Sequence, residues 1–214
     1  MKPAEVERLF AELKFAGMNV ETGDRKLRAN GVSGAIAFPR LPTLRSGSAQ
    51  TVTAESYGHL TLSGSGTKTM PGSAMTIAGN FRMSGTASAT AAQALTVNLN
   101  FSLGSGTTFG AASYSHGLKG NFRNSGTFTA STSTFTFNGT SAQALGGSNA
   151  TTFSSLTINN SSGVALSGVD ATVGGTLTFT SGILDAGASN KVILPASGSV
   201  SRTSGHVKGR LQKN

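Results

Sequence analysis

The stretch Gly-Asn-Phe-Arg-Met-Ser-Gly-Thr at positions 79–86 recurs as Gly-Asn-Phe-Arg-Asn-Ser-Gly-Thr at positions 120–127. A second echo aligns Tyr-Gly-His-Leu-Thr-Leu-Ser-Gly-Ser-Gly (57–66) with Phe-Ser-Ser-Leu-Thr-Ile-Asn-Asn-Ser-Ser (153–162). Repeats of this kind, in which short apolar alternations are separated by Gly, Ser and Asn, are typical of stacked β architectures. They decide the predicted fold.

Around these echoes the sequence has the period of two that half-buried β-strands require. Large apolar residues alternate with Thr, Ser or Asn at Leu60/Leu62, Phe135/Phe137, Leu156/Ile158 and Leu177/Phe179. A sandwich or meander would also use such strands, but only a solenoid needs each coil to offer the next one the same shape. Neither the hexapeptide pattern of left-handed helices nor the calcium-binding Gly-Gly-x-Gly-x-Asp repeat is present.

The sequence therefore predicts an all-β fold, a right-handed parallel β-helix (β-solenoid) with a short helical segment at its N-terminus. At about 20 residues per coil, the separation of Phe81 from Phe122 corresponds to two coils. The wider separation of the second copy from the third, which contains Leu177, suggests an insertion around positions 127–140. The expected inward-facing residues fall into three sets: Leu60, Leu62, Ile77 and Phe81; Phe101, Leu103, Leu118 and Phe122; and Leu156, Ile158, Val173 and Leu177.

Three segments are expected along the chain: a non-repeat segment (1–46), the solenoid repeats (47–200) and a truncated basic tail (201–214). In the first, Val6, Leu9, Phe10 and Leu13 have helical spacing, which predicts one amphipathic helix. The segment is interpreted either as a helical module that caps the first coil or as the product of a shifted frame or start site. No apolar run of a signal peptide follows the initial Met-Lys.

The composition excludes several classes of function. The chain has no cysteine and no apolar run of the length, about 18 residues, that a membrane-spanning helix needs. Thiolate metal sites, disulfides and such a helix are therefore not expected. Its formal net charge is +9, but the repeat region carries few of the charged residues. Because nucleic-acid binders concentrate positive charge on one face, specific nucleic-acid binding is not predicted.

Catalytic chemistry is not predicted either. Carbohydrate-active β-helices need clustered carboxylates for acid–base catalysis or calcium binding. The repeat region has only Glu55, Asp170 and Asp185; stacking of coils could bring the last two together, and the alternative is that both are turn residues. The three histidines do not have the spacing of metal ligands. No enzyme activity, catalytic residue, cofactor or metal is therefore expected.

Two sets of side chains are candidates for a binding surface. Outward threonines could form rows that bind ice or glycans, and two arginines at equivalent repeat positions could bind anionic glycans, although both arginines could equally be solvated surface residues. This candidate surface comprises Thr134, Thr136, Thr176, Thr178, Thr180, Arg82 and Arg123, and the pair Thr127/Thr129 is a further candidate row. The uneven spacing of the copies argues against a long flat threonine array. Asparagines at positions 121, 124, 159 and 160 could stack as structural ladders.

Four stretches resemble the repeats of large exported bacterial β-solenoid surface proteins, both adhesin-like or autotransporter-like passengers and Bacteroidetes-type secreted repeats. They are Gly-Asn-Phe-Arg-Asn-Ser-Gly-Thr-Phe-Thr-Ala (120–130), Phe-Asn-Gly-Thr-Ser-Ala-Gln-Ala-Leu-Gly-Gly (137–147), Phe-Ser-Ser-Leu-Thr-Ile-Asn-Asn-Ser-Ser-Gly-Val (153–164) and Gly-Thr-Leu-Thr-Phe-Thr-Ser-Gly-Ile-Leu-Asp (175–185). The resemblance covers roughly positions 47–210. It implies an extracellular or cell-surface parent protein with an export signal and a C-terminal anchoring or sorting domain.

The predicted function is a non-catalytic, structural or interaction fragment of such a surface protein, a stalk or passenger. The alternatives are an ice- or glycan-binding module that uses the threonine rows, and a polysaccharide-active β-helix enzyme. The expected partners are glycans or other cell-surface components, with no specific nucleic acid and no membrane insertion. Exposed terminal coils are also expected to favour end-to-end self-association.

Overall fold

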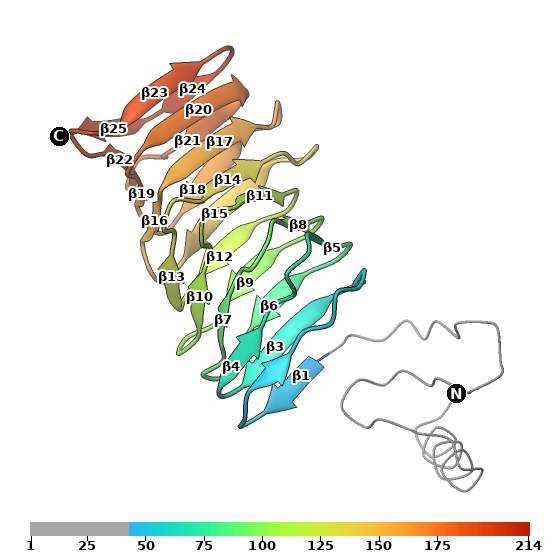
Figure 1. Ribbon diagram of the computed structural model, residues 1–214. Helices are drawn as coiled ribbons and strands as arrows, with labels where there is room; N and C mark the ends of the chain where they lie inside the picture. The colour runs from blue at the N-terminus through green and yellow to red at the C-terminus, as the bar shows by residue number, and fades with distance from the viewer. Residues whose placement is uncertain (1–42) are drawn as a thin grey trace, which may run out of the picture.

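The computed structural model describes residues 43–214, and this part of the chain is an all-β, parallel β-solenoid (Figure 1). Every paired strand lies parallel to its neighbour, one coil before or after it. The predicted parallel β-solenoid is confirmed. The helix expected near the N-terminus, with its capping role, lies outside the described residues.

Two sheets extend along most of the solenoid. Sheet A contains β1 (Thr43–Ser46), β3 (Leu60–Gly64), β6 (Phe81–Met83), β9 (Phe101–Leu103), β12 (Phe122–Asn124), β15 (Gln143–Gly147), β18 (Val164–Ser167), β21 (Ile183–Asp185) and β24 (His206–Lys208). Sheet C contains β5 (Met75–Ile77), β8 (Leu95–Val97), β11 (Ser115–Leu118), β14 (Thr134–Phe137), β17 (Ser155–Asn159), β20 (Thr176–Ser181) and β23 (Ser199–Arg202).

The remaining side is divided between two shorter sheets. Sheet B contains β2 (Gln50–Thr51), β4 (Thr67–Thr69), β7 (Ser88–Thr90), β10 (Thr108–Gly110) and β13 (Thr127–Thr129). Sheet D contains β16 (Thr151–Phe153), β19 (Ala171–Val173), β22 (Lys191–Leu194) and β25 (Arg210–Lys213). The last strand of sheet B and the first of sheet D are neighbours, but no strand ladder joins them.

The first sequence echo corresponds to two coils, as predicted. Phe81 pairs with Phe101, and Phe101 pairs with Phe122, so the two copies lie on the same face with one coil between them. The length of a turn varies moderately along the solenoid. It is short between Thr43 and Thr61, at the beginning, and longer between Phe122 and Leu145, in the middle.

The second echo, in contrast, does not mark equivalent positions. Leu60 lies on sheet A, whereas its counterpart Leu156 lies on sheet C. Every side of the solenoid needs the same alternation of apolar and hydroxyl residues followed by a turn, so similar sequences arise on different sides. The large insertion inferred around positions 127–140 is wrong for the same reason. Phe122 pairs directly with Leu145, so this coil is only slightly longer than the coil from Phe101 to Phe122.

All the predicted inward-facing residues are buried in one continuous core. They form columns in which each side chain packs on the one from the preceding coil. In sheet A the rings of Phe81 and Phe101 stack with centroids 4.8 Å apart, and Phe101 and Phe122 stack at 5.2 Å. Aromatic rings bury large apolar areas, so this column supplies much of the packing at the centre of the solenoid.

Asparagine side chains add a hydrogen-bonded ladder along one corner, just before the sheet A strands. Asn80 Oδ1 accepts from the backbone N–H of Asn100 (3.0 Å), and Asn100 Oδ1 accepts from the backbone N–H of Asn121 (2.9 Å). Asn121 Oδ1 then accepts from the N–H of Ala144 (2.7 Å). A structural ladder was expected at position 121, but its partners come from neighbouring coils and not from position 124.

Asn124 has a different role, at the junction between sheets B and D. It occupies the core-facing position taken by Leu103 in the coil before, and it is buried. Its side-chain Nδ2 donates to Thr151 Oγ1 (3.2 Å). Its backbone carbonyl oxygen accepts from the N–H groups of Ser148 (3.1 Å) and Asn149 (3.0 Å). One residue thus connects the end of one coil to the first strand of sheet D.

The strands of the described solenoid extend beyond both predicted boundaries, 47 and 200. β1 lies within the expected N-terminal segment, and the expected tail forms strands. β23, β24 and β25 pair with β20, β21 and β22, respectively, so the basic residues after position 200 belong to a further coil. The sequence signal was weak there because core-facing positions of this coil carry charges.

Candidate functional site: rows of hydroxyl side chains

Sheet C presents a row of small hydroxyl side chains on its outer face. Adjacent strands pair these positions directly, and all but one of the residues carry a hydroxyl group. The row comprises Thr76, Thr96, Gly117, Thr136, Thr157, Thr178 and Ser201. The inward neighbours of these residues are mostly large and apolar, so the alternation fixes the face on which the hydroxyls lie.

A second row lies two positions earlier in each strand. Thr134 pairs with Ser115 and Ser155, and Thr176 pairs with Ser199. The consecutive strands β14, β17, β20 and β23 therefore each present a hydroxyl pair. We define the hydroxyl array as the residues of these pairs: Thr134, Thr136, Ser155, Thr157, Thr176, Thr178, Ser199 and Ser201.

The geometry of a parallel sheet sets the spacing of this array. Neighbouring strands lie about 4.8 Å apart, and residues i and i+2 of one strand lie about 6.6 Å apart. The array residues on β14, β17 and β20 are half-buried, whereas Ser199 and Ser201 are exposed. Thr176 Oγ1 and Ser199 Oγ lie 3.1 Å apart and share a hydrogen bond across the strands. The result is a regular polar lattice on the outer face of sheet C, over the buried apolar core.

Four of the predicted residues lie in this array: Thr134, Thr136, Thr176 and Thr178. Thr180 does not continue it, because the register between β17 and β20 shifts after Ile158 and Phe179, and Asn159 then pairs with Ser181. Sequence reasoning missed Ser155, Thr157, Ser199 and Ser201. Ser155 and Thr157 could have been found from the alternation around Leu156 and Ile158, because the neighbours of an inward-facing residue on a strand face outward.

The pair Thr127/Thr129 lies on a different side, in sheet B. The pair lies on β13, the last strand of that sheet. Other outward-facing hydroxyl residues of sheet B include Thr67, Thr69, Ser88, Thr90 and Thr108. The ladder pairs Thr90 and Thr129 with Gly110, which lacks a side chain. The expected threonine surface is thus divided between sheets B and C.

The two arginines lie on a third side and do not form a continuous ladder. Arg82 and Arg123 share one outward row of sheet A, where each pairs with Ser102 in the coil between them. Two strand spacings, about 9.6 Å, therefore separate their backbones. Both side chains are exposed. The predicted surface is divided in the same way, with its threonines on sheet C and its arginines on sheet A.

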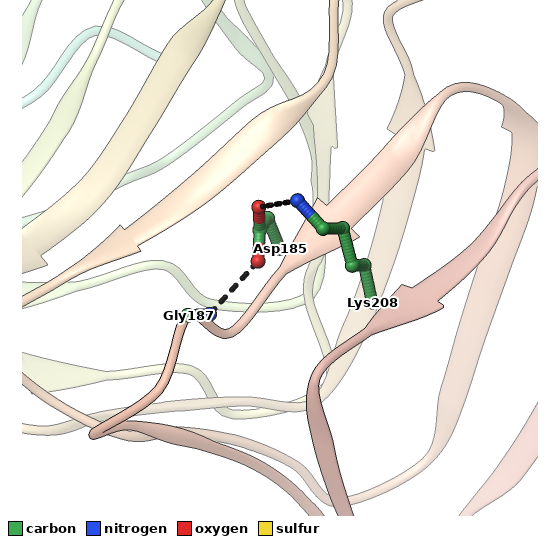
Figure 2. A network of polar contacts seen from close by, with 3 residues as sticks. All are labelled: Asp185, Gly187 and Lys208. Atoms are coloured by element: carbon green, nitrogen blue, oxygen red, sulfur yellow. Dashed lines mark hydrogen bonds and ion pairs between the residues drawn. The ribbon is translucent and has the colours of Figure 1, made fainter.

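The carboxylates of Asp170 and Asp185 are held at different sheets. Asp185, on β21, forms an ion pair with Lys208 at 2.9 Å and accepts from the N–H of Gly187 at 2.9 Å (Figure 2). The hydrogen bond from Lys208 is the main cause that lowers the pKa of Asp185, and the Gly187 bond adds to it. Asp170 accepts from the N–H of Lys191 at 2.7 Å, on sheet D. The structure thus gives each carboxylate a local structural partner.

His116 is a buried member of the core. Its Nδ1 accepts from the N–H of Leu95 (3.1 Å), so Nε2 carries the proton and donates to the carbonyl of Ala111 (2.8 Å). The ring also packs on Phe135, with centroids 4.8 Å apart. Burial is the main cause that lowers its pKa, which favours the neutral ring. Within residues 43–214, no three His, Cys, Asp or Glu side chains group as metal ligands would.

The part of the chain that the structure describes contains no helix with the length and apolar character needed to span a membrane. No protein-family model matches the sequence, and comparison with curated proteins and with solved structures finds no match either.

Proposed function

We propose that the protein is a non-catalytic structural and interaction module of an exported bacterial surface protein, an adhesin-like stalk or passenger. The observation that carries this proposal is the continuity of sheets A and C. The nine strands of sheet A and the seven of sheet C stack in parallel over an unbroken apolar core. Such a stack is a rigid spacer with large flat sides, which suits the display of binding surfaces away from a cell. We further propose that its winding is right-handed.

Localisation tests this proposal. An antibody against the folded solenoid should label intact cells that express the natural gene, and external protease should remove the label. A cytoplasmic protein used as control should resist the protease until the cells are lysed. If the solenoid is also protected until lysis, the surface assignment is overturned. An experimental structure at side-chain resolution tests the handedness directly.

A second candidate function is binding of a regular surface, either a polysaccharide or ice, by the hydroxyl array. The specific observation in its favour is that hydroxyl pairs lie in register on consecutive strands of sheet C. The uneven spacing of the sequence copies was expected to interrupt such an array. Strand pairing places the hydroxyl residues of each coil beside those of the next coil, whatever the spacing of the sequence copies. The expected interruption of the array therefore does not occur.

A single bulky, charged substitution in the hydroxyl array tests this second candidate function. Thr157→Lys would project a long charged side chain from the middle of the array, while Thr108→Lys would do the same on sheet B. We expect sedimentation with insoluble polysaccharides, or inhibition of ice recrystallisation, to be lost in the first variant and kept in the second. A wild-type protein that is inactive in both assays would rule out the candidate, as would equal activity of the two variants.

The proposal that the module is non-catalytic rests on the partners of its carboxylates. Asp170 and Asp185 are each engaged with lysine backbone or side-chain groups of neighbouring coils, on separate sheets. Acid–base hydrolysis of glycosides needs two carboxyl groups that flank one bond. Turnover of a polysaccharide that disappears in Asp170→Asn or Asp185→Asn would show that the module is an enzyme.

A further inference from the structure

The outer face of sheet A carries a row of residues in which arginine recurs two coils apart. β6, β9 and β12 are consecutive strands of this sheet (Figure 1), and they place Arg82, Ser102 and Arg123, which we call the arginine row, in one ladder. Both arginines are exposed, and the serine between them is half-buried. Two strand spacings, about 9.6 Å, separate the arginine backbones, so the small serine leaves room for a ligand between the guanidinium groups.

The two guanidinium groups are not used to hold the solenoid together. Among residues 43–214, neither Arg82 nor Arg123 has a hydrogen-bond or ion-pair partner for its side chain. A guanidinium group is always charged, and its planar fork of N–H donors matches the two oxygens of a carboxylate. Both side chains are therefore available to an anion from solution.

The sequence keeps negative charge away from this face. From position 56 to position 169 the chain contains no Asp or Glu. The same stretch adds a further exposed cation, Lys119, in the turn that precedes β12. On sheet A, the carboxylate of Asp185 lies three strands beyond Arg123 and is paired with Lys208. The arginine row therefore lies in a region of positive potential, which attracts anionic ligands.

The asparagine ladder adds neutral donors beside the arginine row. Asn80, Asn100 and Asn121 lie two positions before its three residues, and their Oδ1 atoms accept from backbone N–H groups of the next coil. Because a backbone N–H can only donate, this pairing fixes the opposite atom of each amide as the Nδ2 donor. Within the described solenoid, none of these three Nδ2 groups has a hydrogen-bond partner. Amide donors thus recur at each strand spacing, about 4.8 Å.

This arrangement selects the chemistry of a ligand. Arginine binds carboxylates by paired, charge-assisted hydrogen bonds, and free amide N–H groups can donate to the hydroxyl oxygens of sugars. The donors follow the axis of the solenoid across successive strands, so a matching ligand is extended and has a repeating structure. A linear polysaccharide that presents a carboxylate on alternate sugars meets these conditions, because two extended sugar units have a length comparable to two strand spacings.

We propose that the arginine row and the asparagine ladder bind a linear acidic polysaccharide that lies along sheet A. Its carboxylates contact Arg82 and Arg123, and the neutral sugar between them lies over Ser102. The inference rests on the proposed interaction role and names a partner for it, on a different side of the solenoid from the hydroxyl array. Since the main contacts are exposed charges, the affinity should decrease as the salt concentration rises.

Hyaluronan oligosaccharides, in which a uronic acid alternates with a neutral sugar, test the site by calorimetric titration of the purified full chain. We expect Arg82→Gln and Arg123→Gln each to raise the Kd about fivefold, and the double variant to raise it at least about tenfold. Arg210→Gln removes an exposed charge from sheet D and should bind as wild type does. No binding by wild type, an equal loss in Arg210→Gln, or equal affinity for neutral dextran would overturn the proposal. None of these outcomes changes the result of the localisation test, because that test does not involve the ligand.

A rearranged variant tests the spacing while the net charge stays constant. Ser102→Arg combined with Arg123→Ser keeps two arginines in the row but places them on adjacent strands, about 4.8 Å apart. We expect its Kd for hyaluronan to rise at least about fivefold, with the circular dichroism spectrum and melting temperature of wild type. If this variant binds as tightly as wild type does, positive charge alone explains the binding and the proposed site is wrong.

Discussion

The ring of Phe101 lies parallel to that of Phe122, with 3° between the ring planes and 5.2 Å between the centroids. The same ring stacks on Phe81 in the preceding coil and contacts Phe109 and Phe135 edge-on. Phe101 is 1% exposed. A single side chain thus joins neighbouring coils and different sides of the solenoid at its centre.

Replacement of this ring should therefore be costly. We expect Phe101→Ala to lower the free energy of unfolding by about 3–5 kcal/mol, because it removes a large buried side chain and leaves a cavity. The neighbouring outward-facing variant, Ser102→Ala, should change it by no more than about 0.5 kcal/mol. Denaturant unfolding followed by circular dichroism measures both, and similar midpoints for the two would contradict this core.

The glycine at position 85 should resist substitution by any side chain. Its φ is +69°, and a Cβ added there would lie 2.5 Å from the carbonyl oxygen of Gly64 in the coil before. We expect Gly85→Ala to cost about 2 kcal/mol or more, from strain at positive φ and from the clash. Gly72→Ala, where a Cβ would meet nothing within 4 Å, serves as the control. A Gly85→Ala melt that matches this control would contradict the turn geometry.

Stability should fall as the pH decreases from 7 to 5, in part because of His116. Burial lowers the pKa of the folded-state ring, so the unfolded chain binds a proton that the folded chain excludes. The loss reaches at most about 1.4 kcal/mol per pH unit below the ordinary pKa of about 6.5, and it ends once the pH passes the lowered folded value.

Substitution by glutamine isolates this contribution. The side chain of His116→Gln can accept from Leu95 and donate to Ala111 without titrating, so its stability should depend less on pH over this range. The His206→Gln variant, at an exposed histidine, serves as the matched control. Denaturant melts at several pH values measure these slopes. If the slope of His116→Gln equals that of wild type, proton exclusion at this ring is refuted.

The asparagine ladder should depend on an acceptor oxygen and not on the amide as such. Asn100→Ala removes the acceptor for the N–H of Asn121 and should cost about 1 kcal/mol, the usual net value of one hydrogen bond. Asn100→Asp keeps an acceptor at the same place and should lose less. Thermal melts compare the two, and a larger loss in the aspartate variant would show that the amide nitrogen matters more.

The sequence was sufficient to predict the parallel solenoid and its core, because alternation and turn residues are local properties. It was not sufficient to assign a residue to one of the sides. Leu60 and Leu156 follow the same local rules, yet only the register between coils separates sheet A from sheet C. The threonines and arginines were grouped as one surface for this reason, although they lie on different sides.

The polar residues at core-facing positions also show what the sequence alone can and cannot predict. His116 lies two positions before Leu118, an expected core residue, so its inward position could have been inferred. Arg202 and Lys213 could not, because a charged side chain after an apolar run is normally taken as the end of the structure. Their positions in the core columns follow only from pairing with the preceding coil.

The junction at Asn124, between sheets B and D, should divide the unfolding of the solenoid into two steps. Where sheet B ends at β13 and sheet D begins at β16, neighbouring coils are joined by strand ladders on two sides instead of three. In a linear array, each coil is stabilised mainly by its nearest neighbours, so the weakest interface sets the boundary between cooperative units. Partial unfolding should therefore stop at this junction, and amide hydrogen exchange should divide the solenoid into two blocks with separate opening free energies.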